Sequence, residues 1–272
     1  KGVRAMYEKV ILELKGICKT FNRGSVNEKV ALRDFNLSVN EGDFITVIGG
    51  NGAGKSTLMN VICGTYPVDE GSIILGGKDV TRLPEYRRAK YLGRVFQDPM
   101  MGTSPNMEIQ ENLALAYRRG KLRSLMPGIR RSEKQFYREQ LSRLGLGLED
   151  RMTAKVGLLS GGQRQSLTLL MATLKRPELL LLDEHTAALD PKTAAKVLAF
   201  TEEIAAENNL TTVMITHNMM DAIRCGNRLI MMQEGRVIYD VCGEEKSALS
   251  VKDLLERFRE SGGEVNDRMV LG

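Results

Sequence analysis

Residues 44–56 read FITVIGGNGAGKS, an apolar run followed by a glycine-rich turn and a Lys-Ser pair. The run Phe44–Ile48 predicts a buried strand, and we expect a helix from about Lys55 to Gly64, which can end it. Residues 49–56 match the pattern G-x-x-x-x-G-K-[ST], which requires a strand, a turn and a helix in this order. The stretch therefore predicts an α/β fold with a phosphate-binding turn.

The residue types in this turn suit the phosphates of a nucleotide. Glycines allow successive backbone N–H groups to face one concavity, and the helix N-terminus adds positive potential there. We expect Lys55 to reach the β- and γ-phosphates and the Ser56 hydroxyl to ligate Mg²⁺. The predicted nucleotide-binding residues of the turn are Gly49, Gly50, Asn51, Gly52, Ala53, Gly54, Lys55, Ser56 and Thr57.

A second apolar run, Leu179–Leu182, ends in two carboxylates. We expect Asp183 to bind Mg²⁺ and Glu184 to act as the general base for the attacking water. The alternative is an acidic pair that merely caps a helix, and the phosphate-binding turn elsewhere in the chain argues against it. Together, the two motifs predict hydrolysis at a nucleotide phosphate.

The rest of the chain alternates strand-like runs with helical patterns, as α/β domains do. Short strands are predicted at 72–75 and 91–96, and residues 211–216 suit the centre of a parallel sheet. Residues 229–232 and 237–241 flank a turn and predict a hairpin. No period of 20 to 50 residues repeats, which argues against a solenoid.

Residues 99–156 differ from their surroundings because they are basic and patterned as helices. Ser132 and Gln135 predict a capping box at the start of one of these helices. We expect a helical subdomain inserted into a larger domain that spans residues 7–243. The remaining residues, 244–272, are predicted to hold one amphipathic helix, Val251–Glu260, and a polar end.

The composition is that of a globular protein, because 42% of the 272 residues are hydrophobic and 27% are charged. Apolar runs are far shorter than the roughly 20 residues of a membrane-spanning helix, and we expect no signal peptide before Met6. Four cysteines without C-x-x-C spacing and two histidines predict reduced thiols and no zinc site. We therefore expect a cytosolic chain that does not itself span a membrane.

The positive charge of the chain is concentrated in one segment. The sequence has 39 Lys and Arg against 34 Asp and Glu, a net charge of +5. Between Arg118 and Arg138 there are eight Lys and Arg but only one acidic residue, Glu133. Such a segment can face anionic lipid, an acidic partner or solvent alone. Nucleic acid is the least favoured partner, because few aromatic residues are interleaved.

Residues 159–165 read LSGGQRQ and predict a second helix N-terminus that can bind an anion. Ser160 and Gln163 form a capping box, so the N–H groups and the helix dipole are directed outward. One ATP rarely needs two γ-phosphate sites, and we therefore expect this site to serve the ATP of a neighbouring copy. The predicted inner face of this helix carries Leu167, Leu170, Met171 and Leu174.

With LSGGQ at residues 159–163, the sequence resembles the ATP-binding-cassette (ABC) ATPases over nearly its whole length. The resemblance implies the α/β fold of a P-loop NTPase: a RecA-like core with an antiparallel β subdomain and an inserted α-helical subdomain. The other motifs of the family follow in the expected order: KTF with Phe21, VFQDP with Gln97, ALD with Asp190 and ITH with His217.

The resemblance also implies roles for these residues. Phe21 is expected to stack on adenine, the alternative being a core position. Gln97 is expected to touch Mg²⁺ and the attacking water, and His217 the γ-phosphate. The residues expected to bind the nucleotide from a second copy are Ser160, Gly161, Gly162, Gln163 and Asp190. The expected catalytic residues are Glu184, His217, Gln97 and Lys55, and the expected metal ligands are Ser56, Gln97 and Asp183.

The function implied is ATP hydrolysis by two copies, arranged head to tail around two ATP molecules with Mg²⁺. The pair would drive separate transmembrane permease subunits from the cytoplasmic face of the membrane. Residues 183–190, DEHTAALD, are similar to a bacterial subgroup proposed to import amino acids or other small solutes, which adds a solute-binding lipoprotein to the expected partners. The alternatives are export or lipid extraction, and a soluble ATPase of an assembly system. No nucleic-acid partner is expected.

Two details of the sequence modify this interpretation. His185 stands where most of the family has proline, and we expect it to pack or to contact a loop rather than to act in catalysis. Met100 and Met101 follow Gln97 closely, where related proteins receive a coupling helix of the permease. The alternative is that these methionines fill the core of the helical subdomain, together with Met107.

Overall fold

The computed structural model of the chain describes residues 9–121 and 128–261. Its larger sheet contains the strands β3 (Phe44–Gly49), β6 (Leu92–Val95), β7 (Leu179–Asp183), β8 (Thr212–Ile215), β9 (Arg228–Gln233) and β10 (Arg236–Cys242). They lie in the order β10-β9-β3-β8-β7-β6, parallel from β9 to β6, with β10 antiparallel at the edge. The side chains of β3 and β8 are buried throughout, as in strands covered on both faces.

A smaller antiparallel sheet is built from the strands β1 (Val10–Phe21), β2 (Lys29–Asn40), β4 (Glu70–Leu75) and β5 (Lys78–Asp79). Its order is β2-β1-β4-β5. Along β2, buried and exposed residues alternate, so one face of this sheet contributes apolar side chains to the core. That core also contains Leu58 and Ile62 of helix α1 (Lys55–Cys63) and Val47 of β3. The predicted α/β fold with an antiparallel β subdomain is confirmed.

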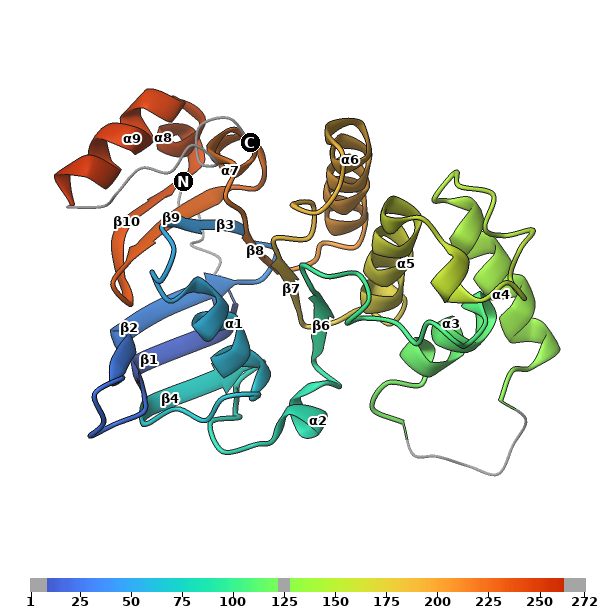
Figure 1. Ribbon diagram of the computed structural model, residues 1–272, viewed down its shortest axis with the longest axis horizontal. Coiled ribbons are helices and arrows are strands. Elements are labelled where there is room, and N and C mark those ends of the chain that lie inside the picture. The colour runs from blue at the N-terminus through green and yellow to red at the C-terminus, as the bar shows by residue number, and fades with distance from the viewer. Residues whose placement is uncertain (1–8, 122–127, 262–272) are drawn as a thin grey trace, which may run out of the picture.

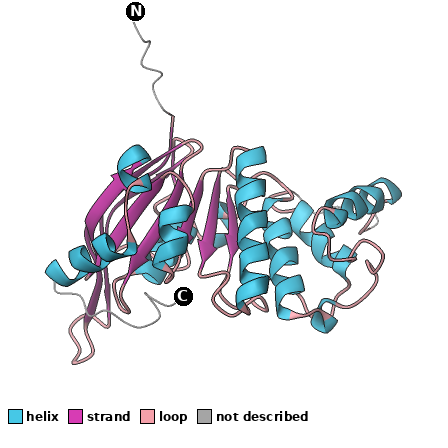
Figure 2. Ribbon diagram, turned by 90° about the horizontal axis from the view of Figure 1, so that it is seen from above, coloured by secondary structure: helices cyan, strands magenta, loops and turns pink. Residues whose placement is uncertain are grey.

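The helices α3 (Ile109–Tyr117) and α4 (Arg131–Ser142) lie at the end of the molecule farthest from the smaller sheet (Figures 1 and 2). Helix α5 (Gly161–Thr173) connects this helical part to the larger sheet. Its Leu167 and Leu170 pack among residues of α3 and α4, whereas Leu169 packs against β7. The predicted inner face is therefore only one of two buried faces. The other helices are α2 (Glu85–Arg88), α6 (Pro191–Glu207), α7 (Met219–Arg224), α8 (Gly243–Ser247) and α9 (Val251–Glu260).

The predicted capping box of Ser132 and Gln135 is wrong. Helix α4 begins at Arg131, so Ser132 already lies inside its first turn. The Glu133 carboxylate accepts a hydrogen bond of 2.8 Å from the backbone N–H of Arg130 instead. An acidic side chain also suits the positive end of the helix dipole, and it sets the start of the helix earlier than the serine does.

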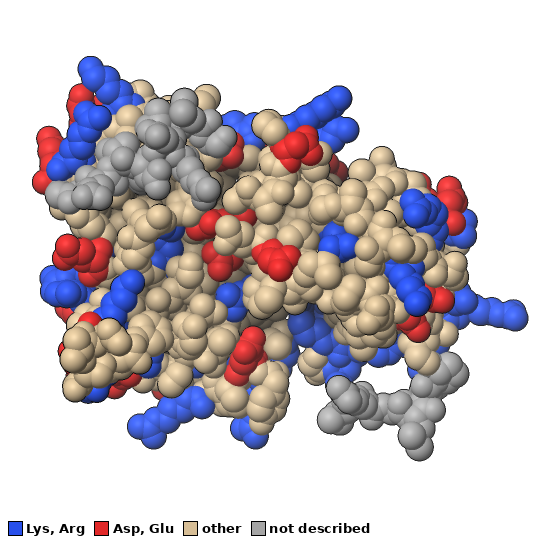
Figure 3. Space-filling view, in the orientation of Figure 1, with Lys and Arg blue, Asp and Glu red and all other residues tan. Residues whose placement is uncertain are grey.

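Several guanidinium groups of the basic segment 118–138 are engaged within the protein. Arg118 forms an ion pair of 2.9 Å with Glu133, and Arg119 donates to the carbonyl oxygens of Ala172 and Lys175. On the face seen in Figure 3, Lys and Arg lie both at the rim and within the face and are not gathered in one patch. Part of the positive charge of this segment therefore stabilises contacts within the helical part and between that part and the end of α5. Met6, residues 122–127 of the basic segment and residues 262–272 of the predicted polar end lie outside the described residues.

All four cysteines are free thiols, as expected: Cys18, Cys63, Cys225 and Cys242. Burial raises the pKa of the Cys63 thiol to about 11 and that of Cys225 to about 12, so neither is a reactive thiolate near neutral pH. Across residues 9–121 and 128–261, every helix is too short or too polar to cross a membrane.

Candidate active site

The predicted motifs converge at one edge of the larger sheet. Parallel strands place their carboxyl ends together, and ligands of open α/β sheets bind at this edge. Strand β3 leads into the glycine-rich turn, β7 into Glu184, β8 into His217 and β6 into Gln97. The sheet therefore gathers residues that are far apart in the sequence.

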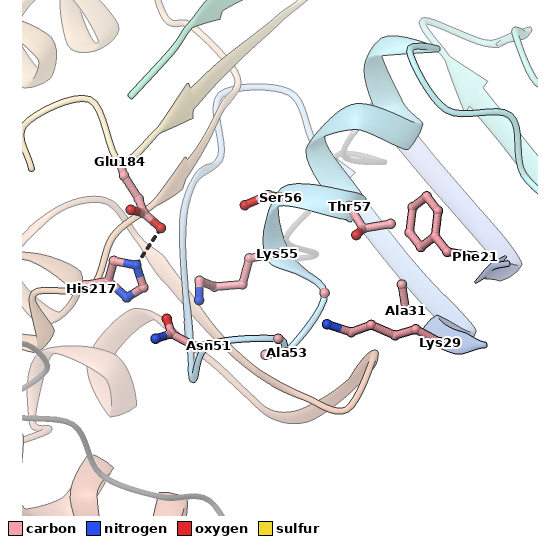
Figure 4. A pocket seen from close by; sticks show the side chains of 12 residues that line it. Phe21, Lys29, Ala31, Asn51, Ala53, Lys55, Ser56, Thr57, Glu184 and His217 are labelled. Atoms are coloured by element: carbon pink, nitrogen blue, oxygen red, sulfur yellow. Dashed lines mark ion pairs between the residues drawn. The ribbon is translucent and has the colours of Figure 1, made fainter. Parts of the chain in front are cut away.

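A cavity of about 230 Å³ opens at this edge. Glu184 and His217 lie at one end and Phe21 at the other, with the glycine-rich turn between them (Figure 4). The cavity is lined by Phe21, Lys29, Ala31, Asn51, Gly52, Ala53, Gly54, Lys55, Ser56, Thr57, Glu184 and His217. All of these except Lys29 and Ala31 are residues that the sequence analysis selected.

The glycine-rich turn is held in a conformation that only glycine permits at its last position. Gly54 has a φ of 100°, and a Cβ atom there would lie 2.4 Å from the carbonyl oxygen of Ala31. No side chain caps the N-terminus of α1, so its first N–H groups remain available to a ligand. The turn thus provides backbone donors at the positive end of a helix, as phosphate binding requires.

Lys55 is buried at the base of the turn. Its Nζ donates to the carbonyl oxygens of Gly49 at 2.7 Å and Gly50 at 3.1 Å. Burial lowers the pKa of Lys55, while the nearby carboxylates of Glu184 and Asp183 act in the opposite direction. The ammonium group is therefore positioned beside the backbone groups that face the cavity.

Glu184 and His217 form a close pair across the ends of β7 and β8. The Nε2 atom of His217 lies 2.6 Å from a carboxylate oxygen of Glu184, and Glu184 is buried. The backbone of Glu184 has a φ of 46°, in the left-handed region that non-glycine residues rarely adopt. Strain of this kind, roughly 1–3 kcal/mol, is concentrated at functional sites. The pair has the arrangement of a general base held by an orienting group.

Asp183 lies one residue before this pair and is mostly buried. Burial raises the pKa of its carboxyl group, and Arg94, whose Nη2 lies 3.8 Å away, opposes that shift. The Asp183 carboxylate and the Ser56 hydroxyl are hard oxygen donors of the kind Mg²⁺ prefers. Among the described residues there is no cluster of three or more His, Cys, Asp or Glu that would hold a metal alone. Mg²⁺ usually keeps waters and shares its shell with substrate phosphates, so one carboxylate and one hydroxyl are protein ligands that suit it.

Gln97 does not line the cavity. It is exposed, two residues after the end of β6, and β6 is the outermost strand of the parallel set. Three strand spacings, roughly 14 Å, separate β6 from β3. The roles expected for Gln97 toward Mg²⁺ and water therefore remain predictions.

The signature residues also lie outside the cavity, at the N-terminus of α5. The capping box is confirmed: the Ser160 hydroxyl accepts from the N–H of Gln163 at 3.3 Å, and the Gln163 side chain accepts from the N–H of Ser160 at 3.1 Å. A Cβ atom at Gly162 would lie 2.2 Å from Thr193 of α6. Glycine at this position therefore allows the two helix N-termini to approach each other.

Helix α6 begins beside this signature segment. The Asp190 carboxylate accepts from the N–H of Thr193 at 3.1 Å, and Pro191 occupies the first helical position, so Asp190 caps α6. The nucleotide contact expected for Asp190 remains a prediction. Ser160, Gly161, Gly162 and Asp190 thus lie on one surface that is separate from the cavity.

Phe21 and Lys29 border the far end of the cavity. Phe21 packs edge-on against Tyr66, with 5.3 Å between ring centroids, and its stacking on adenine remains a prediction. Lys29 lies at the start of β2, and its Nζ would be 3.6 Å from a Cβ atom on Gly52. Sequence reasoning missed Lys29, because a single exposed lysine carries no motif.

His185 is buried beneath the site. Its Nε2 lies 3.0 Å from the hydroxyl of Thr201 in α6, and that hydroxyl donates to the carbonyl oxygen of Val197. Burial lowers the pKa of His185 to about 4, so the ring is neutral near pH 7. The expected packing of His185 is confirmed, and its absence from catalysis remains a prediction.

Comparison with known proteins gives one family. The sequence pattern of the ABC transporter family matches residues 32–187 of the chain. The chain is 43% identical to a tyrosine transport ATP-binding protein of Clostridioides difficile, over 91% of the chain and 98% of that protein. It is 30% identical to the spermidine/putrescine import ATP-binding protein PotA of Haemophilus influenzae over 86% of the chain, and it spans 59% of that relative's length.

A solved structure agrees with these relatives. The chain is similar, with a TM-score of 0.73 and 29% identity, to the ATP-binding cassette MJ0796. That structure is a dimer in a post-hydrolysis state, bound to ADP and Pi. The similarity covers 85% of this chain and 98% of that one.

Proposed function

This chain belongs to the ABC transporter family of ATP-binding proteins and hydrolyses ATP, and we propose that it powers the import of a small solute of the amino-acid class. The observation that carries the proposal is the cavity in which the phosphate-binding turn, Glu184 and His217 converge. The tyrosine transport protein supports the solute class, because the similarity extends over nearly the full length of both chains.

We propose that residues 49–57 bind the phosphates of ATP. The uncapped N–H groups of α1 would donate to the β-phosphate, and Lys55 would exchange its contacts with the Gly49 and Gly50 carbonyls for phosphate oxygens. Ser56 and Asp183 would hold Mg²⁺, which neutralises charge on the β- and γ-phosphates when it is bound. Phe21 would stack on adenine at the opposite end of the cavity.

Hydrolysis would then depend on the pair at the ends of β7 and β8. Glu184 would accept a proton from the attacking water as that water approaches the γ-phosphate. The contact of 2.6 Å with His217 holds the carboxylate in place, and His217 would reach the γ-phosphate as this contact opens. Gln97 would join the site when its loop moves inward.

We propose that the signature surface binds the ATP of a second copy. Ser160, Gly161 and Gly162 present a helix N-terminus, and none of the three lines the cavity. A head-to-tail dimer would place this surface over the γ-phosphate bound to the other copy's turn. The dimeric cassette with ADP and Pi supports this arrangement by similarity.

The permease is proposed to dock beside the loop after β6. Met100 and Met101 are 42% and 67% exposed, so they do not fill the core of the helical subdomain. Exposed Leu158 lies just before the signature segment and adds apolar surface of the kind that suits a partner. Replacement of both methionines by glutamate (Met100→Glu with Met101→Glu) should uncouple hydrolysis from transport, and unchanged transport would contradict this docking site.

One experiment tests the import function. The tagged chain is expressed in its native host, the membranes are solubilised gently, and the copurifying proteins are identified by mass spectrometry. We expect a small permease and a solute-binding lipoprotein, consistent with a position on the inner face of the membrane. A permease without the lipoprotein would indicate export or lipid extraction. Soluble partners alone would overturn the transport function and leave ATP hydrolysis intact.

A further inference from the structure

Helix α9 (Val251–Glu260), near the end of the chain, packs behind the phosphate-binding turn. The helix starts with a capping box between Ser250 and Asp253 and has one strongly apolar face. Leu254 and Phe258 on this face are 0% and 1% exposed. They belong to an apolar cluster with Ile48 of β3, the strand that leads into the turn.

Phe258 touches the turn itself. A Cβ atom on Gly50 would lie 3.1 Å from the Cζ atom of Phe258, so the ring packs directly against the backbone of Gly50. The carbonyl oxygen of Gly50 is one of the two that hold the Lys55 ammonium group. The aromatic ring therefore contacts the backbone on which the phosphate-binding lysine rests.

A second contact ties the end of α9 to the same turn through β9. The Gln233 side chain donates to the carbonyl oxygen of Ser261 at 2.7 Å and accepts from the Ser261 hydroxyl. Gln233 ends β9, and two residues later the N–H of Gly235 donates to the carbonyl oxygen of Ala53 at 3.0 Å. The C-terminal end of α9 is thereby fixed to the hairpin that supports the turn from below.

The same apolar cluster reaches the histidine side of the site. Met219 belongs to it and is the first residue of α7, two positions after His217. Asn218, between them, caps α7 by accepting from the N–H of Asp221 at 3.1 Å. Helix α9 therefore packs at once against the phosphate-binding turn and against the helix that follows His217.

We propose that α9 is a brace for the nucleotide site and that Phe258 is a positioning residue for the phosphate-binding turn. The inference rests on the proposed binding of ATP by residues 49–57. Phe258 limits the movement of Gly50, and the cluster holds this backbone in a fixed relation to the loop of His217. Small displacements of groups that bind phosphate are costly, because the N–H donors and Lys55 must converge on one anion.

Two buried residues of the same helix provide a matched test. Phe258→Ala removes the contact with Gly50, whereas Leu254→Ala removes apolar packing in the same cluster and leaves the contact between Phe258 and Gly50 in place. The dissociation constant of ATP with Mg²⁺ is measured by calorimetry on the full chain, and the stability of each variant by urea unfolding. We expect Phe258→Ala to weaken ATP binding about tenfold and Leu254→Ala to change it by less than about twofold. Phe258→Leu serves if the alanine variant does not fold.

A double-mutant cycle separates positioning from general stability. In the otherwise unchanged chain, Gly50→Ala forces a methyl group against the Phe258 ring and should weaken ATP binding severalfold. In the Phe258→Leu variant the ring is absent, and the same Gly50→Ala change should weaken ATP binding much less. A smaller effect of Gly50→Ala on ATP binding in the Phe258→Leu variant is expected only if the Phe258 ring positions the turn.

The outcomes distinguish the brace from the proposed function. If the unaltered chain binds no ATP, the proposed function fails and the brace with it. If it binds ATP but Phe258→Ala and Leu254→Ala weaken binding equally, or neither does, α9 supports only the fold and the brace is overturned. Additive effects of Gly50→Ala and Phe258→Leu would also overturn it.

Discussion

Two helix N-termini of this protein have similar sequence signals but different surroundings. Helix α1 follows residues 49–54 and has no side-chain cap, and its first turn faces a cavity that also contains Glu184 and His217. The N-terminus of helix α5 is capped by Ser160 and Gln163, and neither residue lines that cavity. An anion site therefore needs more than a helix N-terminus. In α1 the neighbouring strands supply the other groups, whereas for α5 we propose that a second copy supplies them.

The largest expected effect tests whether the α1 site contains the chemistry. Glu184→Gln keeps the shape of the side chain but removes the proton acceptor, so turnover should fall by about 10² to 10⁴ while ATP binding persists. Phosphate release and calorimetry measure the two properties, and light scattering should show an ATP-dependent dimer that no longer dissociates.

Glu207→Gln on α6 is the control, because it makes the same chemical change on an exposed surface away from the cavity. It should leave turnover unchanged. Full activity of Glu184→Gln would show that another group removes the proton, and the α1 site would then lack its proposed base.

A smaller effect is expected at the α5 site, where one charge can separate folding from function. Gly161 begins α5, and a Cβ atom there would meet only Leu189, at 3.6 Å, an ordinary contact. Gly161→Asp places an acidic group at a helix N-terminus, which favours the helix but repels the phosphate of a partner. We expect ATP binding by one copy to stay within about twofold. Turnover should fall by roughly 10².

The role of the α5 N-terminus is tested most directly by measuring ATP-dependent dimer formation in chains that also carry Glu184→Gln. Gly161→Asp should prevent the dimer, and Gly161→Asn, which has nearly the same size without the charge, should impair it much less. If the aspartate variant still dimerises and turns over, the α5 N-terminus does not bind phosphate and the contrast between the two helices has another cause.

Sequence patterns predicted most of the α1 site because its motifs are local. In the sequence, the turn 49–56 and the pair at 183–184 each follow a run of residues typical of a buried strand. The parallel pairing of β3 and β7 with β8 then brings the two motifs to the same edge of the sheet. The same reasoning selected His217 through a family motif. Asp183, Glu184 and His217 each lie within two positions of a strand end, and the turn begins where β3 ends, so the sheet largely determines their places.

Residues placed by tertiary packing could not be predicted in this way. Lys29, Arg94 and Phe258 reach the site from elements whose relation to it depends on register and on how the elements pack. The predicted start of α4 was wrong for a related reason. The hydrogen bond that caps the helix joins the Arg130 N–H to the Glu133 carboxylate and does not involve Ser132. Gln97 shows a further limit, since a motif does not tell whether its loop is already at the site.

The smallest expected effect concerns Lys29, the cation at the edge of the α1 site that no motif predicted. Its Nζ lies beside Gly52 and lines the cavity, so it adds positive potential where the phosphates are proposed to bind (Figure 4). Because Lys29 is exposed, this attraction is screened by solvent and salt. Lys29→Met should weaken ATP binding by roughly two- to fivefold at low ionic strength. The difference from the unaltered chain should shrink at about 0.5 M salt, where the Debye length is only a few ångströms.

The control for Lys29 is Lys134→Met, which removes the same charge from an exposed position on α4, a helix that lies far from α1 and its phosphate-binding turn (Figure 1). Calorimetry at two salt concentrations compares the variants. We expect Lys134→Met to leave ATP affinity unchanged at both. If both variants lose ATP affinity equally, ATP responds only to the net charge of the protein. If only Lys29→Met loses affinity, and only at low salt, Lys29 belongs to the groups with which one chain completes the α1 site. Residues 160–163 at the α5 N-terminus do not line this cavity, so a charge introduced there is expected to act on the dimer and not on ATP binding by one copy.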